Sequence, residues 1–528
     1  MPVMQRLPLF LRILRRRTRK GPPARYDVQW QSGVAVPAAD GVPLMTDHYA
    51  PVTGDPCPTV MVRAPYVRIG FPFNYLYGAL FAEQGFHVIL QSSRGTGGSG
   101  GEFDPWQGER EDSLATVAWL REQEWFSGEL YTIGASYMAF TQWALAGDPP
   151  PEWRGAVMQV GHTDPHDFFW RGGAFGLERA LVGGVGLFTQ AMTGKDYFLA
   201  VLRLQRHLKR AVRGVPLLDV YPQVYGGRRP ILEQWLEHPE PEFWHASDLT
   251  PLADKLAVPV SLSTGWWDLS PEQVIEHYVR LRAAGHEPDL LIGPWTHTSA
   301  LEDGWAELFA QAMRRLRGEP SPYRVRVFVG GAGEWRDLPS WPPPEIREER
   351  WFLGEGTLGL AEGTGSTSFR YDPTDPTPAI GGALQSPTQG QRDQAELEKR
   401  SDVVTFTGPV LSSPLEIIGA VRAEFDASTT AVSGDLFARL CDVDPAGKSV
   451  NICDGLTRSA EAGRVVVEMG PAGHRFRPGH RIRLQVSGGA HPRFLRNYGT
   501  GEPPGRATRM VATDTTVQHT STLVLPVV

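Results

Sequence analysis

The chain has 528 residues and a net charge of −7, and 41% of its residues are hydrophobic. This length predicts about three domains with cores of ordinary size, because one domain usually takes about 100–200 residues. The first 25 residues carry +8 and no acidic residue, which leaves −15 for the rest of the chain and argues against a nucleic-acid-binding body.

The basic N-terminal tail, residues 1–25, has two interpretations. Leu7, Phe10, Leu11 and Leu14 recur at helical spacing, so residues 1–20 could form an amphipathic helix in peripheral contact with an anionic membrane. The alternative is a solvated tail, since chain termini are commonly loosely held. The charges interrupt the apolar run, which disfavours a cleaved signal peptide, and no stretch approaches the ~20 apolar residues of a membrane span.

Three cysteines, Cys57, Cys441 and Cys453, are too few for a disulfide framework. They favour a reducing compartment, so we expect a cytoplasmic protein, with peripheral membrane contact through the tail as the alternative. No Cys or His spacing indicates a zinc site, and no metal or cofactor is expected.

Residues 26–162 alternate short apolar runs with helical patterns. The runs at 59–63, 87–91, 130–133 and 156–161 have the length of buried strands, and 113–120 is helical. This rhythm predicts the first part of an α/β core with a mostly parallel sheet.

In residues 163–249 the alternation of strand and helix patterns stops and helical patterns dominate, which predicts a cap inserted over the sheet. The alternation resumes over 250–350, with strands at 258–263, 289–293 and 323–329 and helices at 271–284 and 307–311. From 351 to 528 only short strand patterns between Gly, Pro and Asp turns remain. That composition predicts a β-sandwich of the jelly-roll type.

The segment Gly134-Ala135-Ser136-Tyr137-Met138-Ala139 joins a predicted strand to a predicted helix. A serine at such a turn is typical of the nucleophile elbow of α/β-hydrolases, in which small neighbours permit a strained backbone. Met138 stands where the general motif has glycine, and a helix N-cap serine is the simpler alternative.

Two downstream residues match the order Ser, Asp, His of an α/β-hydrolase triad. Asp268 and His297 each follow a predicted strand, so Asp268 would orient His297, which would take the Ser136 proton. Asp268 could instead cap a helix, and His297 could be a surface turn residue. His162 and His166 are rival histidines, but they precede Asp268 and break the order.

Further motifs lie along the chain on both sides of the Ser136 turn. They are Asp40-Gly41-Val42-Pro43-Leu44, Arg63-Ala64-Pro65-Tyr66, Arg94-Gly95-Thr96-Gly97-Gly98-Ser99-Gly100-Gly101-Glu102-Phe103, Gly265-Trp266-Trp267-Asp268, Gly293-Pro294-Trp295-Thr296-His297, Glu334-Trp335-Arg336, Arg439-Leu440-Cys441-Asp442-Val443 and Phe476-Arg477-Pro478-Gly479-His480-Arg481-Ile482. Together with the Ser136 turn they resemble the CocE/NonD hydrolases, the group of cocaine esterase, X-Pro dipeptidyl-peptidase, α-amino-acid ester hydrolase and glutaryl-cephalosporin acylase. The resemblance runs from about residue 34 to residue 528.

The resemblance implies an α/β-hydrolase core with a helical cap and a C-terminal β jelly roll of the galactose-binding-like type. It implies that the Tyr66 hydroxyl and the backbone N–H of Tyr137 form the oxyanion hole. Ala139 replaces the final glycine of the family's elbow, and Ser92 stands where relatives often have Asp. The amino-ester branch binds a substrate ammonium with further acids, whereas Asp268 is followed here by Leu269-Ser270-Pro271.

We therefore expect a serine hydrolase that cleaves small carboxylic esters, or amides, through an acyl-enzyme, with Ser136, Asp268 and His297 as catalytic residues. Trp170, Trp267 and Trp295 are candidate substrate-binding residues, with core packing as the alternative. Two other functions are an X-Pro dipeptidyl-peptidase and a non-catalytic protein that binds ligands through its β-domain. The oligomeric state and natural substrate stay open.

Overall fold

The computed structural model describes residues 4–7, 20–66, 68, 73–188, 195–460 and 462–528. An eleven-stranded sheet forms its core, in the order β1-β2-β3-β5-β4-β6-β7-β8-β9-β10-β11. The strands are β1 (Gln5–Arg6), β2 (Val28–Pro37), β3 (Pro43–Pro51), β4 (Thr59–Ala64), β5 (His87–Ser92), β6 (Leu130–Ala135), β7 (Trp153–Gln159), β8 (Val260–Trp267), β9 (Asp289–Thr296), β10 (Val325–Val329) and β11 (Glu334–Leu338).

The central strands, β5 to β10 in sheet order, pair in parallel, and the outer strands pair antiparallel. Side chains alternate between the two faces of this sheet, as in β4, where Val60 and Val62 join one buried cluster and Met61 joins the other. Helices cover both faces, so the parallel strands are buried throughout. These helices are η1 (Asn74–Ala79), α2 (Leu80–Ala82), α3 (Glu109–Arg121), α4 (Tyr137–Leu145), α12 (Pro271–Ala283), η6 (Ser299–Leu301) and α13 (Trp305–Leu316).

Only two short pieces of the predicted N-terminal tail lie among the described residues. Gln5 and Arg6 pair antiparallel with β2, and Lys20 Nζ donates to the carbonyl of Leu301 over 3.1 Å. The predicted amphipathic pattern at Phe10, Leu11 and Leu14 lies outside the described residues. Membrane contact through residues 1–20 stays a prediction.

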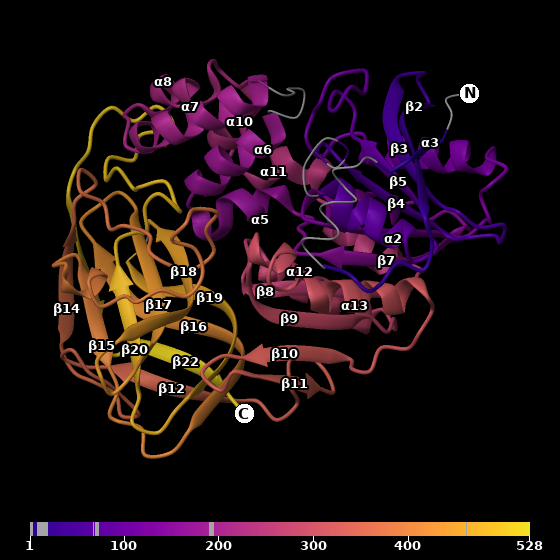
Figure 1. Cartoon of the computed structure of the whole chain (residues 1–528). Helices are drawn as coiled ribbons and strands as arrows, with labels where there is room; N and C mark the ends of the chain where they lie inside the picture. The colour runs from indigo at the N-terminus through magenta and orange to yellow at the C-terminus, as the bar shows by residue number, and fades with distance from the viewer. Residues whose placement is uncertain (1–3, 8–19, 67, 69–72, 189–194, 461) are drawn as a thin grey trace.

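The predicted helical cap stands beside the carboxyl ends of the strands, between the core and the C-terminal region (Figure 1). Its elements are α5 (Pro165–Trp170), η2 (Arg171–Gly173), η3 (Arg179–Gly183), α6 (Gly184–Phe188), α7 (Lys195–Ala211), α8 (Leu217–Val220), α9 (Pro222–Tyr225), α10 (Pro230–Glu237), α11 (Pro241–Trp244) and η4 (His245–Ser247), and η5 (Thr250–Lys255) leads from the cap back into the core. No helix in the described part of the chain combines the length and apolar character needed to cross a bilayer.

The C-terminal region is built from antiparallel sheets, as the sequence predicts. One sheet has seven strands, β12 (Arg347–Leu353), β13 (Leu358–Gly359), β14 (Ser366–Tyr371), β16 (Leu415–Thr429), β19 (Gly463–Phe476), β21 (Thr513–Gln518) and β22 (Thr522–Val527), and the other has four, β15 (Val403–Thr407), β17 (Gly434–Val443), β18 (Ser449–Ser459) and β20 (Arg481–Ser487). The one further element is η7 (Leu397–Lys399) among the described residues. Apolar side chains from both sheets share one core, which is the packing of a β-sandwich.

The β-sandwich packs against the core and the cap through close backbone contacts. Gly330 N–H donates to the carbonyl of Gly473 over 2.9 Å, joining the end of β10 to β19. Gly172 of the cap lies against the carbonyl of Leu456 in β18, which a Cβ at residue 172 would approach to 1.8 Å. The three regions therefore form a continuous body around the strand ends (Figure 1).

We predict that Gly172→Ala destabilises the protein more than Gly447→Ala. Both glycines have positive φ, +67° and +87°, so both substitutions carry the left-handed penalty of about 1–2 kcal/mol. A Cβ at residue 447 meets nothing within 4 Å, whereas at residue 172 it collides with backbone. The additional overpacking cost is about 1–3 kcal/mol, measurable from urea unfolding. Equal destabilisation by the two variants would contradict this packing.

Candidate active site

Ser136 lies at a strained turn between β6 and α4. Its φ of 60° and ψ of −123° place a non-glycine residue in a sparsely populated region. A Cβ at Gly134 would meet Met138 Cβ at 2.2 Å, so a side chain at residue 134 would collide with the first turn of α4. A Cβ at Gly161 would lie 2.6 Å from Ala139 Cβ, which explains why small residues surround the turn.

His297 connects Ser136 to Asp268. Its Nε2 atom lies 3.0 Å from Ser136 Oγ, and its Nδ1 atom lies 2.6 Å from Asp268 Oδ1. Ser136 follows β6, while Asp268 and His297 follow β8 and β9 directly. The carboxyl ends of parallel strands meet at one edge of the sheet, so three residues distant in sequence come together.

The Asp268 carboxylate is buried and held by two further donors. Thr264 donates its hydroxyl to Oδ2 over 2.9 Å, and the backbone N–H of Leu269 donates to Oδ1 over 2.7 Å. These bonds fix the carboxylate so that Oδ1 faces the imidazole. Thr264 directly precedes the motif Gly265-Trp266-Trp267-Asp268, but its contact with the carboxylate depends on how β8 ends and was not predicted.

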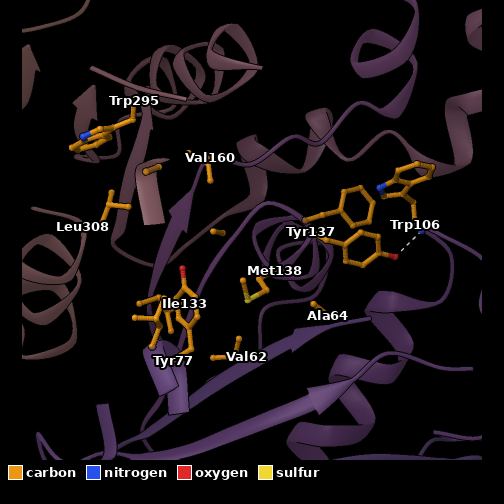
Figure 2. Close-up of a cluster of buried hydrophobic side chains, with 14 of the residues drawn as sticks. Val62, Ala64, Tyr77, Trp106, Ile133, Tyr137, Met138, Val160, Trp295 and Leu308 are labelled. Atoms are coloured by element: carbon orange, nitrogen blue, oxygen red, sulfur yellow. Dashed lines mark hydrogen bonds between the residues drawn. The ribbon is translucent and has the colours of Figure 1, made fainter. Parts of the chain in front are cut away.

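Tyr66 and Tyr137 lie beside Ser136. The Tyr66 hydroxyl interacts with the Ser136 side chain and accepts from the backbone N–H of Tyr137, while burial raises the Tyr66 pKa to about 12. The Tyr137 hydroxyl instead points away and accepts from the backbone N–H of Trp106 over 2.8 Å (Figure 2). The Tyr66 side chain therefore stays a protonated donor at neutral and moderately alkaline pH.

The rival histidines occupy other positions. His162 is buried, and its Nε2 accepts from the Trp106 indole over 3.2 Å. Burial, and to a smaller extent the neighbouring His297, lowers the pKa of His162 to about 3. His166 lies nearer the surface, with Nε2 2.8 Å from the carbonyl of Pro239. No group of three or more His, Cys, Asp or Glu residues in the described ranges could hold a metal ion.

Comparison with known proteins assigns the chain to a family. Residues 40–299 match the X-Pro dipeptidyl-peptidase (S15 family) model, and residues 319–524 match the X-Pro dipeptidyl-peptidase C-terminal non-catalytic domain. The chain is also 30% identical to cocaine esterase of Rhodococcus sp. (strain MB1 Bresler), over 94% of this chain and 98% of that protein. The chain belongs to the CocE/NonD family of hydrolases. As a member of this family it is a hydrolase of the serine esterase and S15 peptidase group.

Solved structures share the fold of this CocE/NonD hydrolase over nearly its whole length. A selenomethionine-labelled α-amino acid ester hydrolase has a TM-score of 0.80 at 21% identity, covering 95% of this chain and 97% of the other. An aminopeptidase from the marine sediment archaeon Thaumarchaeota archaeon has a TM-score of 0.79 at 20% identity, covering 96% and 97%. The combination of α/β core and C-terminal all-β region is therefore the family's fold.

The three candidate tryptophans of this CocE/NonD hydrolase lie in different surroundings. Trp170 is buried in the cap and donates its indole N–H to the carbonyl of Trp235 over 2.9 Å. Trp295 is buried beside Gly293 and Gly304, on the opposite side of the cluster in Figure 2 from Tyr137. Trp267 borders a cavity of about 280 Å³. Their role in substrate binding stays a prediction.

The same cavity lies behind Asp268, where the core, the cap and the β-sandwich meet. Asp167 and Glu272 line it, and Arg171 neutralises both carboxylates, with N–O distances of 3.6 and 2.8 Å. Glu272 lies four residues beyond Asp268, just past the segment considered in the sequence. Its pairing with Arg171 brings the cap and α12 together and could not be predicted from spacing.

The buried His162 predicts how stability depends on pH. Its folded-state pKa of about 3 lies below the ordinary 6.5, so the unfolded chain binds the proton first as pH falls below 6.5. We expect unfolding free energy to fall by about 1.4 kcal/mol per pH unit from this group, or about 2 kcal/mol by pH 5. Urea unfolding of His162→Gln should therefore show a shallower pH dependence than the native protein.

The matched control is His245→Gln, because His245 is exposed on the cap. This variant should keep the native pH dependence. If His162→Gln and the native protein lost equal stability between pH 7 and pH 5, the neutral, buried state of His162 would be wrong.

Proposed function

We propose that this protein hydrolyses small carboxylic esters through an acyl-enzyme, with Ser136 as nucleophile, His297 as general base and acid, and Asp268 as the group that orients His297. The observation that carries the proposal is the continuous row of contacts, 3.0 Å from Ser136 Oγ to His297 Nε2 and 2.6 Å from His297 Nδ1 to Asp268 Oδ1. A nucleophile, its base and an orienting carboxylate in hydrogen-bond reach are the requirement for acyl transfer.

In the first half-reaction Ser136 Oγ attacks the ester carbonyl carbon while His297 Nε2 takes the hydroxyl proton. The tetrahedral intermediate then expels the alcohol, which receives that proton from His297. In the second half-reaction His297 deprotonates water, which attacks the acyl carbon and releases the carboxylic acid as the proton returns to Ser136. Asp268 holds Nδ1 protonated and stabilises the imidazolium in both halves.

The oxyanion hole in this proposal consists of the Tyr66 hydroxyl and the backbone N–H of Tyr137. Both donors border Ser136, and the raised pKa keeps the Tyr66 proton in place. In the free protein the N–H of Tyr137 donates to the Tyr66 hydroxyl, so substrate binding would redirect it toward the carbonyl oxygen. Fixed donors of this kind stabilise the charge that develops on that oxygen.

The X-Pro dipeptidyl-peptidase function is the second candidate, because both family models carry that name. A substrate with a free N-terminus carries an ammonium group, which is costly to bury without a partner. Its binding would need a carboxylate of the protein that is not already paired with a basic side chain. The carboxylates that line the cavity behind Asp268 include Asp167 and Glu272, which already pair with Arg171. This pairing leaves Asp167 and Glu272 unavailable to a substrate ammonium, whereas Glu468 lines the same cavity with no ion pair among the described residues, so the comparison of ester and peptide substrates below decides between the two functions.

Ser136→Ala should abolish hydrolysis of a p-nitrophenyl ester, because the nucleophile is removed. An organophosphonate should add its mass to the native protein and leave Ser136→Ala unlabelled. Ser263→Ala is the matched control, since the buried Ser263 hydroxyl has no hydrogen-bond partner among the described residues. Unchanged turnover by Ser136→Ala would refute the proposal, and faster cleavage of a dipeptidyl-Pro amide than of the ester would favour the peptidase.

Tyr66→Phe should lower kcat about 10²–10³-fold, or about 3–4 kcal/mol of barrier, with little change in KM. Tyr77→Phe is the control, because the Tyr77 hydroxyl donates to Gln159 Oε1 over 2.7 Å within the core (Figure 2). Equal kcat values for the two variants would remove Tyr66 from the oxyanion hole.

A further inference from the structure

Helix α7 of the cap presents an exposed face that combines apolar and basic side chains. Phe198 is 61% exposed, Leu202 43% and Leu199 38%, which is unusual for large apolar residues on one helix turn. The same face continues with the exposed cations Arg203, Arg206, Lys209 and Arg210. Side chains three or four positions apart share a helix face, so Phe198 and Leu202 lie in line with Arg206 and Lys209.

The opposite face of α7 is already used. Ala200 and Ala211 are buried, and Leu204 and Leu208 pack against the main hydrophobic cluster. Helix α7 lies at the outer edge of the cap, at the top of the view in Figure 1. Only a partner that approaches from one side can therefore cover the exposed face.

The charge along this face is almost entirely positive. Residues 198–213 contain five Lys and Arg residues and no Asp or Glu, and Asp196 is the one acidic residue in the α7 sequence. None of the four exposed α7 cations forms an ion pair with another described residue. Apart from the N-terminal tail the chain carries a net charge of −15, so this run of basic residues contrasts with an acidic remainder.

We propose that α7 docks on a membrane surface that carries anionic lipid headgroups. A helix with apolar side chains beside a basic row lies in the plane of such a surface, with the apolar groups in the acyl boundary and the cations at the phosphates. A lipid surface is flat, which fits a helix with a single free face.

Other occupants fit this face less well. In a symmetric dimer the same basic patch would meet itself, placing like charges together. A nucleic acid would pair with the cations but offers no apolar partner along its phosphates for Phe198, Leu199 and Leu202. An acidic protein that encloses a basic amphipathic helix needs access to both faces of that helix, whereas one face of α7 is packed against the rest of the cap.

The test measures co-sedimentation of the full-length protein with vesicles. We expect binding to phosphatidylcholine vesicles that contain phosphatidylglycerol, weak binding to phosphatidylcholine alone, and release at high salt. Each cation near an anionic surface strengthens partitioning about fivefold, so Arg206→Gln/Lys209→Gln/Arg210→Gln should weaken it about a hundredfold. Glutamine keeps helix propensity, so α7 should stay folded. Phe198→Ser/Leu202→Ser should also weaken binding, with the cations intact.

The charge control is Arg110→Gln/Arg370→Gln/Arg509→Gln, which removes three exposed arginines elsewhere, and the apolar control is Leu360→Ser, at a 63% exposed residue of the β-sandwich. Thermal unfolding checks that each variant folds. A chain without residues 1–19 should keep the α7-dependent part of binding. The proposal fails if the α7 variants bind as the native protein does, if removing residues 1–19 abolishes all binding, or if the α7 variants instead change dimerisation or binding to duplex DNA.

Discussion

The parallel pairing of the strands that end at Ser136, Asp268 and His297 is the constraint on which the site depends. Parallel strands in register leave the sheet at the same edge, so the loops after β6, β8 and β9 deliver their first polar residues to one place. The imidazole of His297 therefore contacts Ser136, although the two residues are 161 positions apart in the sequence. A shift of β9 by one residue would move His297 away from both partners, whereas a shift of β6 or β8 would break the bond to Ser136 or to Asp268 respectively.

Glycines, which have no side chain, are as important at this edge of the sheet as the polar residues. Gly134 and Gly161 let α4 approach the sheet behind the strained Ser136, and Gly265 lets the backbone of Trp295 lie against β8. Each close contact restricts the backbone conformation of a segment that carries a polar residue of the site. The strain at Ser136 persists because the surrounding strands and helix are buried and well packed.

The cap and the β-sandwich complete the body around these strand ends. The Arg171 guanidinium ties the cap to α12, and Gly172 lets the cap touch β18. Trp267 donates its indole N–H to the carbonyl of Ile452 over 3.0 Å, which links the end of β8 to the β-sandwich. The sandwich thus supports the element that presents Asp268, and a structural role for it follows from these contacts. Helix α7 takes no part in this support on its exposed face.

The sequence by itself determined the features that depend on local patterns. Strand and helix periodicity indicated the α/β core, the cap and the β-sandwich, and the turn chemistry around Ser136, together with the order of Asp268 and His297, indicated the site. Tertiary structure alone decided which side chains meet across elements: Thr264 with Asp268, Arg171 with Glu272, and Trp295 with its buried neighbours. It also decided that Phe198 and Leu202 face outward, because both sides of α7 carry apolar residues and only packing selects the buried one. Short-range preferences are encoded within a few residues, whereas these contacts depend on the distance between segments that the chain brings together only on folding.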